Sequence, residues 1–101
     1  MAALLVSYPA TAGARFDRDY YRATHLPLVG RVFAPHGLTG VDAWFPDDAG
    51  GPTLATAVLR FRDAAARDAA LGHPDAGEAF GDIPNFTDVS PVATPVSAAR
   101  G

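Results

Sequence analysis

The sequence predicts an α+β fold in which a four-stranded antiparallel sheet carries both of its helices on one face. The first observation is the period of the hydrophobic residues, which alternates between strand-like and helix-like segments in the order βαββαβ. The second is a dense turn signal at residues 46–52, which would join the two middle strands as a hairpin. This order is the ferredoxin-like split motif. Because 101 residues are too few for two cores, we expect one domain covering residues 1–101.

The first third of the chain is expected to hold a strand and a broken helix. Residues 4–8 form a short β-rich run that Pro9 ends. From about residue 14 the period becomes helical, with arginines opposite the apolar residues. Pro27 lacks an amide hydrogen and should kink or break the helix, so a second helical piece is expected at residues 28–33. The helical period places Phe16, Tyr20, Ala23, Thr24 and Leu28 on one apolar face.

The remaining elements follow from turn, cap and strand signals. Asp63 can cap the helix that comes after the third strand. Pro91 and Pro95 place the last strand at a sheet edge, because proline cannot donate a ladder hydrogen bond. The expected bounds are 39–45 and 53–61 for the second and third strands, 63–71 for a helix that Gly72 ends, 74–80 for a short helical piece and 89–96 for the last strand.

Both faces of the third strand are largely apolar, and this predicts a dimer. A sheet face that carries no helices should be polar, unless something covers it. A second copy of the chain, related by two-fold symmetry, is the simplest cover. The two alternating sets of side chains are Leu54, Thr56 and Val58 on one face and Ala55, Ala57, Leu59 and Phe61 on the other.

The composition argues against several classes of partner. The net charge is −3 and all eight basic residues are scattered arginines, so we expect no nucleic-acid surface. The absence of cysteine removes disulfides, thiolate metal ligands and cysteine nucleophiles. The apolar start of the chain is too short for a membrane span and lacks the features of a signal peptide. We therefore expect a cytoplasmic protein that binds neither nucleic acid nor membranes.

One stretch carries most of the potential chemistry. Asp17, Tyr21 and His25 are spaced four apart, so an unbroken helix would place them on one stripe. An imidazole beside a phenol can transfer protons near neutral pH. The alternative is structural: a histidine at a helix end can simply interact with the helix dipole, and the tyrosine can be a core residue.

Other candidates give weaker signals. Trp44 shares a strand face with Asp42 and could line a pocket or seal the dimer. His36 lies in a Pro-His-Gly loop and is expected to be exposed, while His73 is expected at the junction of two helical pieces. No pair of histidines has metal-ligand spacing, and no phosphate or dinucleotide motif is present. The sequence therefore predicts neither a metal nor a cofactor.

Several segments together resemble the EthD family, in that family's order and across nearly the whole chain. The most specific part is the tyrosine pair followed by Thr-His-x-Pro-Leu. The matching segments are residues 5–9, Phe16-Asp17, Tyr20-Tyr21, residues 24–29 and residues 84–88. The resemblance implies a dimeric α/β barrel, in which the sheets of two ferredoxin-like chains meet, with a pocket between the helices and the sheet of each protomer.

The resemblance also implies site residues. His25 matches the motif histidine of the family and Tyr21 matches its second tyrosine, so these two are the expected catalytic pair. Related barrels include isomerases, cofactor-free monooxygenases, dehydratases and haem enzymes. From the ends of elements and from aromatic character we expect the substrate-binding wall to contain Tyr8, Trp44, Phe80 and Phe86. Asp17 is expected to bind substrate as well, because of its spacing with Tyr21 and His25.

Three functions remain open from the sequence. The first is a cofactor-independent acid/base enzyme (an isomerase, dehydratase or oxygenase) acting on a small apolar carbonyl, phenolic or lactone metabolite in catabolism or secondary metabolism. The second is a non-catalytic protein that binds an apolar metabolite or a partner enzyme. The third is haem-linked oxidation, for which His25 is the only reasonable axial ligand.

Overall fold

The computed structural model describes residues 2–99 as a sheet with helices packed against it. No helix in this range is long and apolar enough to cross a membrane. The elements are β1 (Ala2–Pro9), α1 (Arg18–Tyr20), the π-helical turn η1 (Tyr21–His25), α2 (Leu26–Phe33), the 3₁₀ turn η2 (Ala34–His36), β2 (Leu38–Trp44), β3 (Thr53–Phe61), α3 (Ala64–Gly72), α4 (Ala76–Gly81), the 3₁₀ turn η3 (Ile83–Asn85) and β4 (Val92–Ser97).

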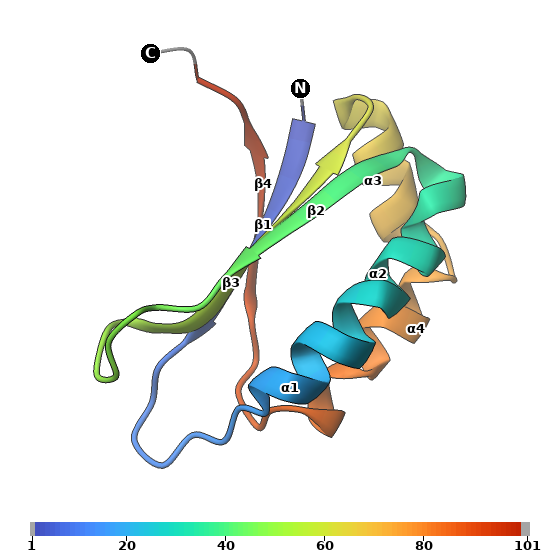
Figure 1. The fold of residues 1–101 in the computed structure, drawn as a ribbon. Coiled ribbons are helices and arrows are strands. Elements are labelled where there is room, and N and C mark those ends of the chain that lie inside the picture. Colours follow the sequence, from blue (N-terminus) through green and yellow to red (C-terminus); the bar gives the residue numbers. More distant parts are fainter. Residues whose placement is uncertain (1, 100–101) are drawn as a thin grey trace.

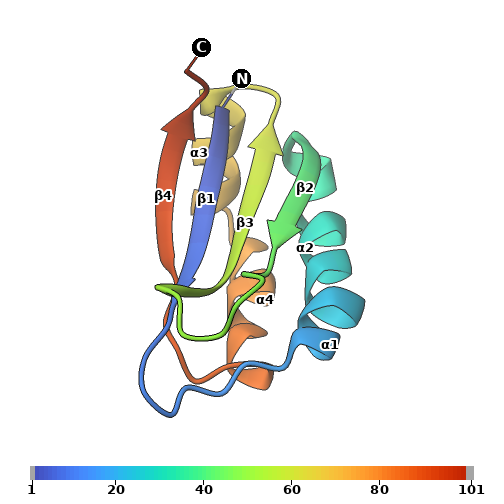
Figure 2. The ribbon, with the colours of Figure 1, turned by 60° about the vertical axis from the view of Figure 1, so that its left-hand side comes forward.

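The four strands form one antiparallel sheet in the order β2-β3-β1-β4, and Figure 2 shows this order across the face of the sheet. β1 pairs with both β3 and β4, so the N-terminal strand is central. This is the ferredoxin-like topology that the sequence predicts. β4 lies at an edge, as Pro95 requires, but it begins three residues later than expected.

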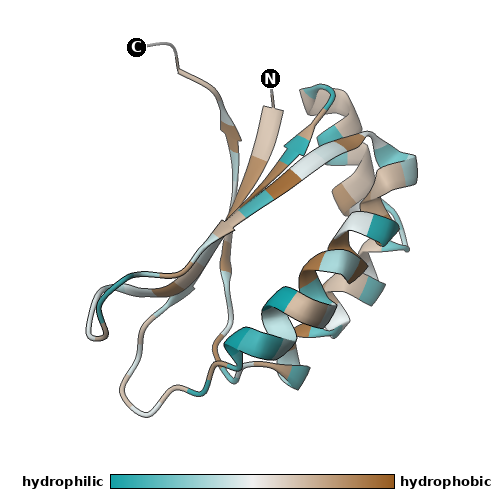
Figure 3. Cartoon of the chain, in the orientation of Figure 1, coloured by the Kyte–Doolittle hydropathy of each residue, from teal (hydrophilic) through white to brown (hydrophobic). Residues whose placement is uncertain are grey.

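The helices all lie on the same side of the sheet, and Figure 1 shows the opposite side uncovered. A hydrophobic core lies between the two layers. Its largest fully buried side chains are Leu4, Tyr8, Tyr21, Phe33, Phe61 and Phe86. Figure 3 shows hydrophobic residues recurring along the strands. The core therefore forms where the sheet and the helices meet, and the site described below is part of that interface.

The first helix begins later than the sequence predicts. Residues 14 and 15 are not helical, and Phe16 forms an isolated bridge with Thr87. Asp17 is the N-cap, and its carboxylate accepts a hydrogen bond from the backbone N–H of Tyr20 at 3.0 Å. A capping carboxylate satisfies an amide that has no partner within the helix, which explains why the helix begins after this residue.

The helix does not break at Pro27, so the break expected there is wrong. A π-helical turn precedes the proline, and the N–H of Leu26 bonds to the carbonyl of Tyr21, five residues back. The wider turn carries the helix through the proline, so α2 begins at Leu26.

The turn also changes which residues face the sheet. Ala23 and Thr24, expected on the apolar face, are exposed. The buried stripe is instead Tyr21, His25, Val29 and Phe33, spaced by four.

The outer face of the sheet is apolar at its centre. Leu5 on β1 lies opposite Val58 on β3, and both side chains are half-buried within a single chain. Trp44 and Val92, near the ends of the two edge strands, are each 57% exposed. Arg60 pairs with Asp42 on the same face and adds a charged rim along β2. An apolar centre with a polar rim is typical of a surface that another molecule covers.

Candidate functional site

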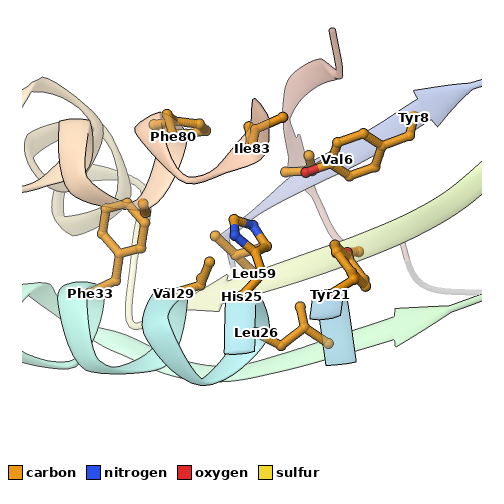
Figure 4. Close-up of a pocket in the computed structure, with 12 residues that line it drawn as sticks. Val6, Tyr8, Tyr21, His25, Leu26, Val29, Phe33, Leu59, Phe80 and Ile83 are labelled. Carbon is orange, nitrogen blue, oxygen red and sulfur yellow. The ribbon is translucent and has the colours of Figure 1, made fainter. Parts of the chain in front are cut away.

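A small cavity lies between the helices and the inner face of the sheet. Its walls come from β1, β3, the helical segment formed by η1 and α2, and α4 with the turn that follows it. The cavity volume is about 20 Å³, which is room for about one water molecule. Figure 4 shows the ring of His25 between the two layers. The lining residues are Val6, Tyr8, Tyr21, His25, Leu26, Val29, Phe33, Ala57, Leu59, Ala79, Phe80 and Ile83.

His25 is the only lining residue whose side chain has a titratable group near neutral pH. Its side chain is 6% exposed, and Nδ1 lies 3.0 Å from Oδ2 of Asp82, which follows α4 in the chain. The side chain of Asp82 is 10% exposed, so the pair is largely removed from water. A hydrogen bond of this kind fixes both the orientation and the tautomer of an imidazole.

Asp82 is itself held by two further donors. The hydroxyl of Tyr20 donates to Oδ1 at 2.7 Å, and the side-chain amide of Asn85 donates to the same oxygen at 2.9 Å. Burial acts to raise the pKa of the Asp82 carboxyl, but the hydrogen bonds from Asn85, Tyr20 and His25 together lower the pKa below its usual value. The carboxylate is therefore ionised and acts only as an acceptor.

The protonation state of His25 follows from this arrangement. Burial lowers the pKa of His25 below its usual 6.5, and this effect outweighs the opposing pull of the Asp82 carboxylate. The ring is therefore neutral at pH 7. Because Asp82 can only accept, Nδ1 carries the single hydrogen of the neutral ring and Nε2 carries the lone pair. The result is a base whose free nitrogen is not engaged by Asp82.

Two tyrosines supply hydroxyl groups to the same cavity. Tyr8 and Tyr21 line it, and their rings meet edge to face at 5.9 Å. Burial raises the pKa of Tyr21 to about 12 and also raises the pKa of Tyr8, so both phenols stay protonated. Within residues 2–99 every fully buried polar side-chain atom has a hydrogen-bond partner. Neither hydroxyl bonds to another residue in this range, so neither oxygen is fully buried and each O–H group can donate to a ligand.

The ring of Tyr21 also positions His25. The two rings are stacked with centroids 5.5 Å apart, because the π-helical turn keeps residues four apart on one side of the helix. Phe86 packs against the other rings of this group and lies 4.5 Å from the centroid of His25. It is completely buried but does not line the cavity. The imidazole is therefore oriented by Asp82 and by two neighbouring rings.

The structure brings together four of the seven site residues expected from the sequence. His25, Tyr21, Tyr8 and Phe80 line the cavity, and Phe86 lies directly behind it.

Asp17 and Trp44 lie outside the cavity. Asp17 caps α1 through its carboxylate, so the spacing of four does not bring it to His25. Trp44 stands on the uncovered face of the sheet, away from the helices.

The sequence alone does not indicate Asp82, although its carboxylate contacts the ring of His25. It is 57 residues from His25, and no local pattern links a residue after α4 to a residue in the first helical segment. The helical period places Tyr20 on the apolar face, but its hydroxyl donates a hydrogen bond to Asp82. The only available signal was the position of Asp82 two residues before the matching segment 84–88.

Comparison with solved structures agrees with this architecture. An EthD-like protein from Ralstonia eutropha superposes on the chain with a TM-score of 0.77 at 29% identity, covering 94% of this chain and 88% of that protein. The resemblance to the EthD family is confirmed. No sequence model of a known family matches this EthD-like chain, and no curated protein matches it in sequence.

Two more distant structures share the EthD-like fold. A dimeric ferredoxin-like protein of unknown function from Jannaschia has a TM-score of 0.67 at 18% identity, covering 96% of this chain and 98% of that one. A cofactor-independent oxygenase from Streptomyces nogalater has a TM-score of 0.71 at 9% identity, covering 99% and 94%. The fold of this chain therefore also occurs in a dimeric protein and in a cofactor-independent oxygenase.

Proposed function

We propose that the chain is a cofactor-independent acid/base enzyme for a small apolar metabolite with a carbonyl, phenol or lactone group. The observation that carries this proposal is the neutral imidazole of His25, held by buried Asp82 and placed on the wall of an apolar cavity. A base with a lone pair near neutral pH, backed by a carboxylate, suits general acid–base catalysis.

In the proposed mechanism, Nε2 of His25 removes a proton from a carbon next to the substrate carbonyl. The electron pair of that C–H bond moves onto the carbonyl oxygen, and Tyr21 donates a hydrogen bond to the developing enolate. Asp82 stabilises the imidazolium that forms. The reaction types differ in the next step. In an isomerase the imidazolium returns the proton to another carbon of the enolate, and in a dehydratase the enolate expels a hydroxide that takes this proton and leaves as water. In an oxygenase the enolate gives one electron to dioxygen as a co-reactant, and the resulting radical and superoxide combine to form a carbon–oxygen bond.

The apolar walls select the substrate, and the cavity has to widen to admit it. Cavities that bind metabolites usually exceed about 300 Å³, far more than the present space. Leu26, Phe80 and Ile83 are the lining side chains that are only partly buried, so they can rotate away at the lowest cost. Haem is a larger ligand still, and it would have to separate α2 from α4 to reach His25.

We propose in addition that two chains form a homodimer through the outer face of the sheet. The apolar centre of that face supports this, as does the dimeric ferredoxin-like protein that shares the fold. The exposed indole of Trp44 would then be buried by the partner. This assigns Trp44 to the interface rather than to the substrate pocket.

A ligand screen by thermal unfolding tests the proposed function. Small aromatic ketones, lactones and quinones are screened against the wild type, His25→Ala and Thr24→Ala. Thr24 is the exposed neighbour of His25 in the same helical segment, and its substitution is the matched control. A ligand at a hundred times its Kd should stabilise the wild type and the control by about 2.7 kcal/mol, with a smaller gain in His25→Ala.

An assay for conversion of each ligand that binds then separates the two main functions. A ligand that is turned over by the wild type and by Thr24→Ala but not by His25→Ala supports the enzyme. A ligand that binds all three proteins equally and is never converted would contradict catalysis and point to a binding protein.

A further inference from the structure

A second cluster of titratable side chains lies at the other end of the helical layer, away from the cavity. His36 ends η2, and His73 and Asp75 lie in the junction between α3 and α4. Nε2 of His36 is 3.0 Å from Oδ2 of Asp75, and Nδ1 of His73 is 3.4 Å from the same oxygen. The two imidazole rings are 4.3 Å apart. Two histidines and one carboxylate therefore converge on one point.

The hydrogen bonds of this cluster are not fully complementary. The backbone N–H of Asp75 donates to Nδ1 of His73 at 3.1 Å, so this nitrogen carries a lone pair rather than a hydrogen. The Asp75 oxygen that faces it also carries lone pairs. His36 can donate to that oxygen, but His73 cannot donate from Nδ1. The lone pairs of His73 Nδ1 and of the Asp75 oxygen therefore face each other, and a cation placed between them would attract both.

We propose that His36, His73 and Asp75 form a binding site for a divalent transition-metal ion such as Zn²⁺. Imidazole and carboxylate are suitable ligands for this class of metal. One ligand atom from each residue lies within 4.8 Å of the other two. Tetrahedral ligands of zinc lie about 3.4 Å apart, so small side-chain rotations close the site. The chain supplies three ligands, and water completes the coordination.

The surroundings of the cluster favour such a site. The carboxylate oxygen of Asp75 lies within 3.4 Å of a ring nitrogen of each histidine, so the three potential ligand atoms are already close together. The side chains of His73 and Asp75 are 44% and 55% exposed, so an ion can enter from solvent and keep a bound water. The Asp75 N–H released by the metal can also bond to water.

The metal ion would link two segments that are distant in the sequence. His36 and His73 are 37 positions apart in the sequence, which is why the sequence alone predicts no metal site. The ion would join the end of the α2 segment to the start of α4, and both of these helices line the cavity. The site is independent of the proposed reaction, because none of its ligands lines the cavity.

Titration of the full chain, purified without a histidine tag and treated with a chelator, tests this site. Titration calorimetry with ZnCl₂ should show that one ion binds per chain. Thermal unfolding should show that the bound ion raises the melting temperature. His36→Gln and Asp75→Asn should each weaken binding by at least about tenfold, because even a residue that only supports a metal ligand is typically worth that much. Asp47→Asn, which removes an exposed carboxylate elsewhere, should bind as the wild type does.

Co²⁺ provides a second readout, since its visible absorption reports bound nitrogen and oxygen ligands. The wild type should develop a visible band at one equivalent that both site variants lose. The absence of saturable Zn²⁺ binding in the wild type would overturn the proposal. Binding that stays equally tight in His36→Gln and Asp75→Asn, with both variants folded by circular dichroism, would overturn it as well.

Discussion

Asp82→Asn is expected to lower turnover by about 10² to 10⁴, the range typical of general acid–base catalysis. The substitution keeps the shape of the side chain but removes the charge that stabilises the protonated ring of His25. An asparagine amide can also donate to Nδ1, which would move the ring hydrogen to Nε2 and block the base. KM should change little, because Asp82 does not line the cavity.

The matched control is Asp88→Asn, the same chemical change at an exposed carboxylate six residues further on. Its oxygen accepts a bond from the backbone N–H of Arg15, and an asparagine oxygen can replace it. The pH profile distinguishes positioning from simple structural support. Asp82 raises the pKa of His25, so in Asp82→Asn the acid limb of the rate profile should move to lower pH. An unchanged kcat with an unchanged acid limb would refute this role for Asp82.

Val58→Asp is expected to dissociate the proposed homodimer. Val58 lies on β3, at the centre of the outer face, opposite Leu5 on β1. In the dimer each protomer would bury an unpaired carboxylate, at a cost of several kcal/mol per ion. The dimer dissociation constant should therefore rise on the order of a thousandfold. Within a single chain the position is half-buried at the solvent side of the sheet, so the protomer should remain folded.

Sedimentation equilibrium at micromolar concentration measures this effect. The wild type should have a mass of about 21 kDa, twice the 10.5 kDa of one chain. Ala23→Asp adds the same charge at an exposed position on the helical side and should remain dimeric. A wild type of 10.5 kDa, or a Val58→Asp variant as dimeric as the control, would argue against an interface on the sheet.

The strand pattern and the helix caps could be predicted because they depend on local signals. β3 spans Thr53–Phe61, as its alternation and the preceding turn predict. Asp63 caps α3 by accepting from the N–H of Ala66 at 2.7 Å, and that helix ends at Gly72. In these elements neighbouring residues determine the conformation, so the sequence around each element is sufficient to place it.

The first helical segment shows where local reasoning stops. Tyr21 and His25 share one side of the helix, as their spacing predicts. The π-helical turn was not foreseen, because its wide hydrogen bonds have no sequence signature. Ala23 and Thr24 are exposed, so the predicted apolar face is wrong at these two positions, whereas Phe16, Tyr20 and Leu28 pack against the core.

The partners of the candidate site depend on tertiary contacts. Asp82 reaches His25 from the second half of the chain, and Tyr20 and Asn85 complete its hydrogen bonds. The cluster of His36, His73 and Asp75 likewise assembles only when the chain folds. Such contacts cannot be read from spacing, since no period of a helix or strand connects the segments.

The proposed function requires that His25 is a neutral base whose hydrogen is fixed on Nδ1 by Asp82. Nitrogen-15 NMR of the imidazole rings, with His25 assigned by comparison with His25→Ala, tests it directly and needs no substrate. At pH 7 the ring should be neutral with its hydrogen on Nδ1, and its pKa should lie below 6.5. A ring that is protonated at pH 7, or that is neutral with its hydrogen on Nε2, would contradict the account.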